Sequence, residues 1–171
     1  MMVPAAPARR RHGLTLIELM IGLAILAVLT SLAAPPFASW LARNRVKSAA
    51  ANLVADLGEA RHESSRRGAP MYVLFQAGAQ WCYAITLDPQ AGCASASSAV
   101  LKRVQASDLP GISVAEAETF AFDGQSGTGL QALSRVRLVS RQGDALQVKM
   151  TRLGRASICA PDGGFVDVPH C

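Results

Sequence analysis

A single carboxylate, Glu18, stands at the edge of a long apolar stretch near the start of the chain. Residues 19 to 42 carry no charge, and 24 helical residues at about 1.5 Å each are enough to cross a hydrocarbon layer of roughly 30 Å. An ionised group at the centre of such a helix costs on the order of 2.5–3.5 kcal/mol to insert, so it usually has a partner or a function. We therefore expect Glu18 to pair with a cation at or inside the membrane boundary.

The residues before Glu18 form a recognisable pattern. A short leader with arginines at positions 9–11 ends in Gly13, and Glu18 is the fifth residue after it. This pattern resembles the processing site of type IV prepilins and type II secretion pseudopilins. The resemblance implies that a prepilin peptidase cuts after Gly13 and methylates the new terminal amine of Leu14, where the family more often has Phe. Glu18 of one subunit would then neutralise the Leu14 amine of a neighbour, because the two charges attract far more strongly in lipid than in water.

Two plainer interpretations of this segment are a secretory signal cut near Ser31–Ala34 and a simple membrane anchor. The acid at the start of the apolar run and Pro35-Pro36 directly after the candidate cut argue against the signal. The leader arginines place the leader in the cytoplasm by the positive-inside rule, so residues beyond Arg43 face the periplasm. The prediction is a single-pass protein of the inner membrane.

The histidines and serines do not favour an enzyme. His12 lies in the leader, His62 in a predicted helix and His170 in the tail, so the sequence pairs none of them for nucleophilic or metal chemistry. The serines lack a nucleophile-elbow context, and residues 127–129 are too short for a phosphate loop. We expect no catalysis, no cofactor and no metal.

The cysteines predict disulfides, because they are even in number and the bulk of the chain is expected in an oxidising compartment. Three connectivities are possible, and the short separations favour two of the pairs. These pairs are Cys82 with Cys93 and Cys159 with Cys171. No spacing among the four resembles a zinc ribbon.

A helix should continue past the membrane segment. Apolar residues recur there at three- and four-residue spacing, namely Val46, Ala50, Leu53, Leu57 and Ala60. The charges fall mostly on other faces: Arg43, Arg45, Lys47, Asp56, Glu59 and Glu63. Arg66-Arg67-Gly68 and then Pro70 predict the end of the helix. Pro35-Pro36 either kinks this helix, which the resemblance implies can then stretch in a filament, or marks the end of its membrane part.

An alternating pattern replaces the helical one after Gly68 and predicts strands over 71–76, 81–87, 100–104, 112–114, 119–122, 135–141 and 146–152. In the last two, the alternation sends Val136, Leu138, Val148 and Met150 to one face. The predicted fold is α+β and pilin-like, with a long N-terminal helix, transmembrane and then amphipathic, packed against an antiparallel β-sheet. The predicted parts are a leader (1–13), a transmembrane and assembly helix (14–42), its amphipathic continuation (43–68) and a periplasmic β-rich domain (69–171). The 171 residues leave room for one small domain beyond the helix.

The helix-then-sheet order, Trp81-Cys82, Cys93 and the terminal Gly154-Arg155 before Cys159 resemble the FimT/GspH group of minor pilins and pseudopilins. The function that this implies is a minor pilin that joins other pilins in a helical filament and helps prime or assemble a type IV pilus. The alternative is an H-like pseudopilin of a type II secretion system. Identical apolar helices that pack head to tail give such a filament when their rotation does not close.

A second alternative is binding of double-stranded DNA during natural transformation. The formal charge of +5 includes the three leader arginines, so the basic bias of the mature chain is local. Its candidate phosphate contacts are Arg135, Arg137, Arg141, Lys149, Arg152 and Arg155. FimT-type pilins are associated with a Gly-Arg-x-Arg motif, and here Gly154-Arg155 is followed by Ala156-Ser157, so the second arginine is missing.

Overall fold

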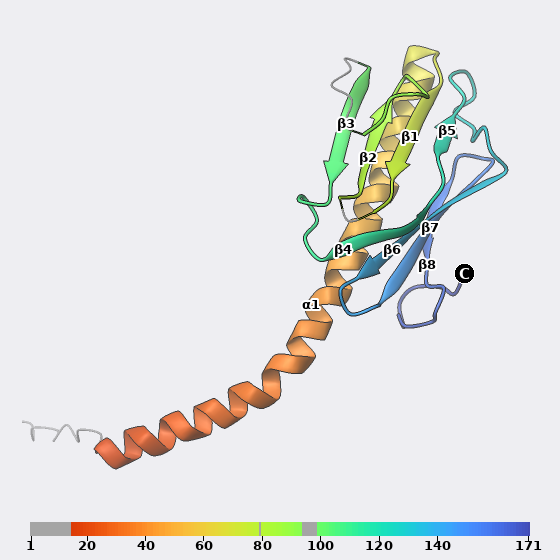
Figure 1. The fold of residues 1–171 in the computed structure, drawn as a ribbon. Coiled ribbons are helices and arrows are strands. Elements are labelled where there is room, and N and C mark those ends of the chain that lie inside the picture. Colours follow the sequence, from red (N-terminus) through yellow and green to blue (C-terminus); the bar gives the residue numbers. More distant parts are fainter. Residues whose placement is uncertain (1–14, 79, 94–98) are drawn as a thin grey trace, which may run out of the picture. The chain divides into compact units, whose positions relative to one another are not determined.

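The protein is described by a computed structural model that places residues 15–78, 80–93 and 99–171, with the side chains of 33–35 left undescribed. The predicted processing residues Gly13 and Leu14 therefore lie outside the described residues. The chain divides into two compact units, Met1–Ala38 and Ser39–Cys171, and each is considered by itself. One helix, α1 (Leu16–Arg67), contributes to both (Figure 1).

The first unit is the apolar part of α1. Thr15 begins the helix, because its Oγ1 accepts the backbone N–H of Glu18 at 3.2 Å, as an N-cap does. The large apolar side chains of residues 16–32 are between 53% and 77% exposed. The hydroxyls of Thr30 and Ser31 donate to helix carbonyls one turn earlier, so these polar groups are satisfied without water. This surface needs lipid or other apolar helices to cover it.

No single helix among the described residues passes a test of length and apolar composition for crossing a membrane. The stretches Leu16–Leu32 and Pro36–Arg67, on either side of a bend in α1, pass that test together.

The end of α1 is as the sequence predicts. Arg66 and Arg67 occupy the last turn, where the negative end of the helix dipole stabilises cations. Gly68 follows with φ of 63°, and the N–H of Ala69 bonds the carbonyl of Ser64 at 3.3 Å.

The second unit places the remainder of α1 against two antiparallel sheets (Figure 1). The first sheet has the order β3-β2-β1-β5, with β1 (Met71–Gln76), β2 (Cys82–Thr86), β3 (Val100–Gln105) and β5 (Phe120–Phe122). The second has the order β4-β6-β7-β8, with β4 (Ile112–Ala117), β6 (Leu133–Ser140), β7 (Ala145–Thr151) and β8 (Ala156–Cys159). The predicted α+β class is confirmed, with two sheets where the sequence indicated one.

Strand bounds differ from the predicted ones at the two turns of the last sheet. Arg141 and Arg152 lie just beyond β6 and β7 because each begins a tight turn. Gly143, with φ of 89°, and Gly154, with φ of 71°, adopt the left-handed conformation that these turns require. The second turn leads into β8, which the sequence pattern missed because its four residues are too few to show alternation.

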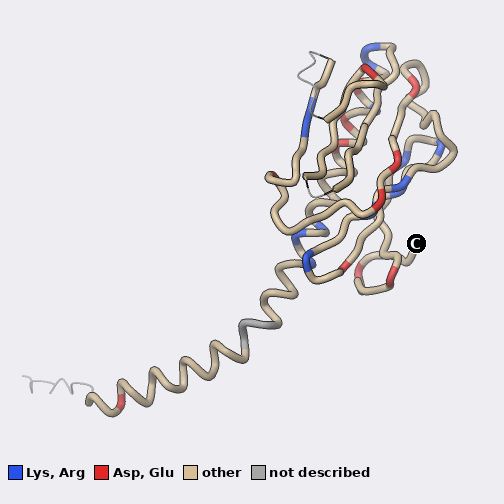
Figure 2. The backbone as a smooth tube through the Cα atoms, viewed as in Figure 1, with Lys and Arg blue, Asp and Glu red and all other residues tan. Residues whose placement is uncertain are grey.

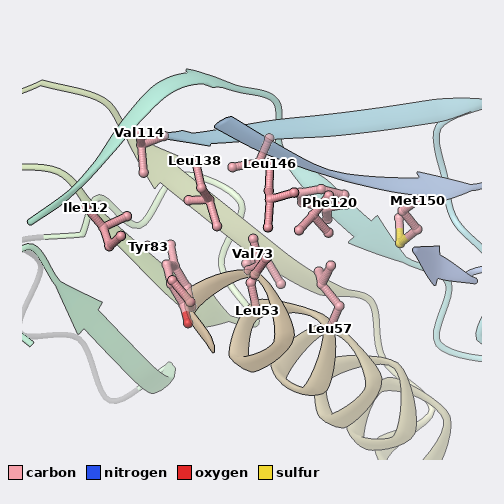
Figure 3. Packing of buried hydrophobic residues seen from close by; sticks show 14 of the residues in the cluster. Leu53, Leu57, Val73, Tyr83, Ile112, Val114, Phe120, Leu138, Leu146 and Met150 are labelled. Carbon is pink, nitrogen blue, oxygen red and sulfur yellow. The ribbon is translucent and has the colours of Figure 1, made fainter. Parts of the chain in front are cut away.

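One core joins α1 to both sheets. Leu53 and Leu57 of the helix pack among Val73 and Phe120 of the first sheet and Leu138 of the second, all at most 3% exposed (Figure 3). The alternation predicted for the β6–β7 hairpin is confirmed, because Val136, Leu138, Val148 and Met150 are all buried. Trp81 links the two sheets, since its Nε1 donates to the carbonyl of Ile112 at 2.8 Å.

Candidate assembly site and charged surfaces

Glu18 occupies the first turn of α1, three residues after its cap Thr15. Its carboxylate is exposed, and no cation among the described residues of this chain pairs with it. The backbone N–H groups of a helix start carry partial positive charge, which stabilises a carboxylate there. The described part of the chain therefore leaves the Glu18 carboxylate open to a cation from outside it, and exposed apolar side chains follow along the helix.

A buried polar contact joins the helix to the first sheet. It involves Asp56, which the sequence pattern placed off the apolar face of the helix. Asp56 is 5% exposed, and its carboxylate accepts the Tyr83 hydroxyl at 2.8 Å and the Lys102 ammonium at 2.6 Å. Burial, with the hydrogen bond to Asp56, raises the pKa of the Tyr83 hydroxyl. The hydrogen bond to Asp56 also raises the pKa of Lys102. Asp56 is thus a positioning residue that holds β2 and β3 on α1.

A second charge cluster lies near the helix C-terminus. Glu63 accepts hydrogen bonds from both Arg66 and Arg67, one turn later on the same face. These bonds, first from Arg66 and then from Arg67, lower the pKa of Glu63 to about 2. The two arginines are therefore engaged within the helix.

The six candidate DNA contacts do not form one free cationic face. Arg135 bonds Glu118 at 3.2 Å and Arg137 bonds Asp162 at 2.8 Å, so two of the predicted cations are paired within the domain. Among the described ion pairs, none involves the other four: Arg141, Lys149, Arg152 and Arg155. Arg141 lies in the β6–β7 turn, whereas Arg152 and Arg155 lie in the β7–β8 turn, at the opposite end of the hairpin. Figure 2 shows the Lys and Arg positions of the domain at several separate places along the chain.

The cysteines are joined as their short separations favour, Cys82 to Cys93 and Cys159 to Cys171. The second bond closes a C-terminal loop that lies against α1. Its Phe165 is 6% exposed and lies under the ammonium of Lys47, 5.4 Å from the ring centre. Lys47 also bonds Asp167 of the loop at 2.7 Å. No sequence pattern indicates this contact, because the loop lacks a regular spacing of apolar residues.

The described residues contain no group of three His, Cys, Asp or Glu side chains arranged to hold a metal ion.

Comparison with known proteins adds to this geometry. Residues 8–34 match the prokaryotic N-terminal methylation motif, and residues 49–154 match the type II transport protein GspH. No curated protein matches the chain.

Two solved structures are similar in fold, both of the type IV minor pilin FimU of Pseudomonas aeruginosa. The first is 17% identical, with a TM-score of 0.56, and the match covers 72% of this chain and 97% of that one. The second, in another crystal form, is 17% identical with a TM-score of 0.53, and the match covers 70% of this chain and 99% of that one. At this identity the likeness concerns the fold, and it is the pilin fold. The sequence match to GspH spans more than half of the chain, and the chain therefore belongs to the GspH/FimT family of minor pilins and pseudopilins.

Proposed function

We propose that this protein is a minor pilin that is cut after Gly13 by a prepilin peptidase, held in the inner membrane by residues 19–42 and then taken into a type IV pilus, whose assembly it helps to prime. The observation that carries the proposal is Glu18. It is an exposed acid in the first turn of an apolar helix, it lies within the segment that matches the N-terminal methylation motif, and it has no cationic partner in the described part of its own chain. An acid so placed is costly in lipid unless a neighbour supplies a cation.

The partner chemistry follows from the cut. Cleavage after Gly13 creates an amine at Leu14, four residues before Glu18, so one subunit carries an ammonium and a carboxylate at the start of its helix. Two subunits offset along the filament axis can then pair Glu18 of one with the Leu14 amine of the other. Because an unpaired charge is unfavourable in the membrane, this contact fixes the axial offset. The exposed apolar side chains of residues 16–32 bury against neighbouring helices at that offset.

The test is the amount of surface pilin sheared from a strain that lacks this gene, compared with the same strain carrying the gene back. We expect pili to be lost on deletion and restored by the gene. A Gly13→Ala version should fail to restore them, since the leader stays attached, and it serves as the matched negative control. Unchanged pili in the deletion strain would contradict a priming role.

A pseudopilin of a type II secretion system is the second candidate, and the match of residues 49–154 to the type II transport protein GspH favours it. The N-terminal helix would act in the same way in both systems, so its properties do not distinguish the two roles. The phenotype of the deletion strain does. Loss of secreted enzymes with normal pili supports the secretion role. Loss of pili with normal secretion supports the pilus role.

Binding of double-stranded DNA is a third candidate, favoured by Arg152 and Arg155 of one turn, which make no ion pair with any other described residue. A gel shift with the full chain in detergent tests it. Binding through phosphates should weaken as salt rises and should weaken further in Arg155→Gln. Affinity that is insensitive to both changes would exclude this activity.

A further inference from the structure

A group of cations lies where α1 leaves its uncharged stretch and enters the second unit. The uncharged stretch ends at Ala42, and alternate residues after it are cationic: Arg43, Arg45 and Lys47. Arg141 is added from the β6–β7 turn.

Two of these four cations are already paired and two are not. Arg43 bonds Asp144 at 3.0 Å, and Lys47 bonds Asp167 at 2.7 Å. Arg45 and Arg141 are exposed and make no ion pair within the described part of the chain. Asp108 lies three residues before Gly111, which both arginines approach. Its carboxylate accepts the backbone N–H of Gln105.

The unpaired arginines lie on one spot of the surface. A Cβ placed on Gly111 would be 3.7 Å from Nη1 of Arg45 and 3.8 Å from Cγ of Arg141, so both side chains pass over this glycine. Gly111 has φ of 88°, and its carbonyl accepts the N–H of Arg141 at 3.1 Å, which fixes the turn beneath them. Asp144, the acid of the same turn as Arg141, is already bonded by Arg43, so an anion from outside the chain can pair with Arg45 and Arg141. A guanidinium group suits phosphate in geometry and charge.

An apolar surface adjoins the arginines. A pocket of about 270 Å³ has Arg45 at its side and is lined by Leu41, Leu109, Pro110 and Ile112. Trp40, the residue before Leu41, is 57% exposed. Tryptophan is enriched at the boundary between lipid and water, where its ring meets headgroups.

We propose that Arg45 and Arg141 bind the phosphate of an anionic phospholipid headgroup, with the neighbouring pocket receiving the first methylenes of the same lipid. The inference rests on the proposed anchoring of residues 19–42 in the inner membrane, because that anchoring brings Arg45 to the headgroup level three residues after the uncharged stretch ends. The site would then hold the globular domain against anionic phospholipids of the periplasmic leaflet until the subunit is taken into a filament.

The test uses the full chain in nanodiscs of phosphatidylcholine alone or with phosphatidylglycerol added, and measures retained lipid by native mass spectrometry. Each cation near an anionic surface contributes about 1 kcal/mol, which is about 5-fold in affinity. We expect phosphatidylglycerol to be retained preferentially. Arg45→Gln with Arg141→Gln should lower that preference by roughly 25-fold if the two act independently. The matched control removes the same charge from the other end of the hairpin, with Arg152→Gln and Arg155→Gln, and should change little.

Several outcomes would overturn the site. They are equal retention of both lipids by the wild type, an equal loss in the two double variants, or displacement of phosphatidylglycerol by inorganic phosphate in the buffer. If the double variant does not fold, Arg141→Gln alone, in an exposed turn, keeps the same comparison with Arg152→Gln. A chain that fails to insert even in phosphatidylcholine contradicts the proposed anchoring instead. A chain that inserts without lipid preference contradicts only the headgroup site.

Discussion

The hydroxyl of Tyr83 donates a 2.8 Å hydrogen bond to Oδ2 of Asp56 across the interface between α1 and the first sheet. Both residues are at most 5% exposed, so the carboxylate relies on protein donors in place of water. Lys102 supplies the other donor from β3, at the edge of the sheet. This contact ties α1 to the first sheet.

Tyr83→Phe should destabilise the domain, because it keeps the ring but leaves Oδ2 of Asp56 without its donor. The expected cost is about 1–3 kcal/mol in the free energy of unfolding. Lys102→Met is the comparison: its side chain is 43% exposed, so the loss from its half-exposed ion pair should be smaller. Urea unfolding of the full chain in detergent, followed by near-UV circular dichroism, measures both. A Tyr83→Phe protein as stable as wild type would contradict the role given to Asp56.

Alkaline pH should weaken the same contact. Burial and the hydrogen bond to Asp56 raise the pKa of Tyr83 above its ordinary value of 10.0. At a pH between the unfolded and folded pKa values, the unfolded chain has therefore lost the tyrosine proton that the folded chain keeps. The stability of the domain is then full below about pH 10 and falls by about 1.4 kcal/mol per pH unit above it. Lys102, whose pKa is also raised, acts in the same direction but is screened by water.

The matched protein for this pH series is Tyr83→Phe. It should lose the tyrosine share of the slope while remaining folded at neutral pH. Identical slopes in the two proteins would show that Tyr83 does not titrate in this way.

Gly154 is expected to tolerate no side chain. A Cβ there would lie 2.5 Å from the carbonyl oxygen of Gly127, and its φ is 71°. Gly143 also has positive φ, 89°, but a Cβ on it meets nothing within 4 Å. Gly143→Ala should cost about 1 kcal/mol through the backbone alone, whereas Gly154→Ala adds a clash of about 1–3 kcal/mol. Equal melting temperatures of the two variants would contradict the close approach of the two loops.

The C-terminal loop should depend on its disulfide. Phe165 of the loop between Cys159 and Cys171 packs against Lys47 of α1. Closing a loop of this length with a disulfide stabilises a protein by about 3 kcal/mol in the chain-entropy view. Cys159→Ser with Cys171→Ser should therefore lower the free energy of unfolding by about that amount. Protease treatment should then cut near Val166, which is exposed at 107%. A loop that stays protected would mean that packing alone holds it.

Much of this architecture can be predicted from residues that lie close together along the chain. Gly68 after two arginines marks the helix end, and the alternation through Val136 and Leu138 marks the buried face of β6, because caps and periods involve neighbours along the chain. The division of the strands between two sheets is not local. Three strands lie between β1 and β5 along the chain, and one of them, β4, belongs to the other sheet, yet β5 pairs with β1.

The candidate sites show the same contrast. Glu18 and its pattern are readable within a few residues, whereas the burial of Asp56 depends on Tyr83 and Lys102, 27 and 46 residues later. The pairing of Arg135 and Arg137 with carboxylates likewise depends on Glu118 and Asp162, which no period connects to them. A cationic strand face in the sequence is therefore not yet a free cationic surface.

The measurement that tests the central proposal most directly is the fate of a Glu18→Ala protein in cells that make filaments. We expect its leader to be removed as in wild type, since the cut lies at Gly13. We also expect it to remain in the membrane fraction and to be missing from sheared filaments, because nothing then pairs with the neighbour's amine. Gly13→Ala, which should keep its leader, is the control for processing. Normal amounts of Glu18→Ala in sheared filaments would contradict the pairing of Glu18 with the Leu14 amine.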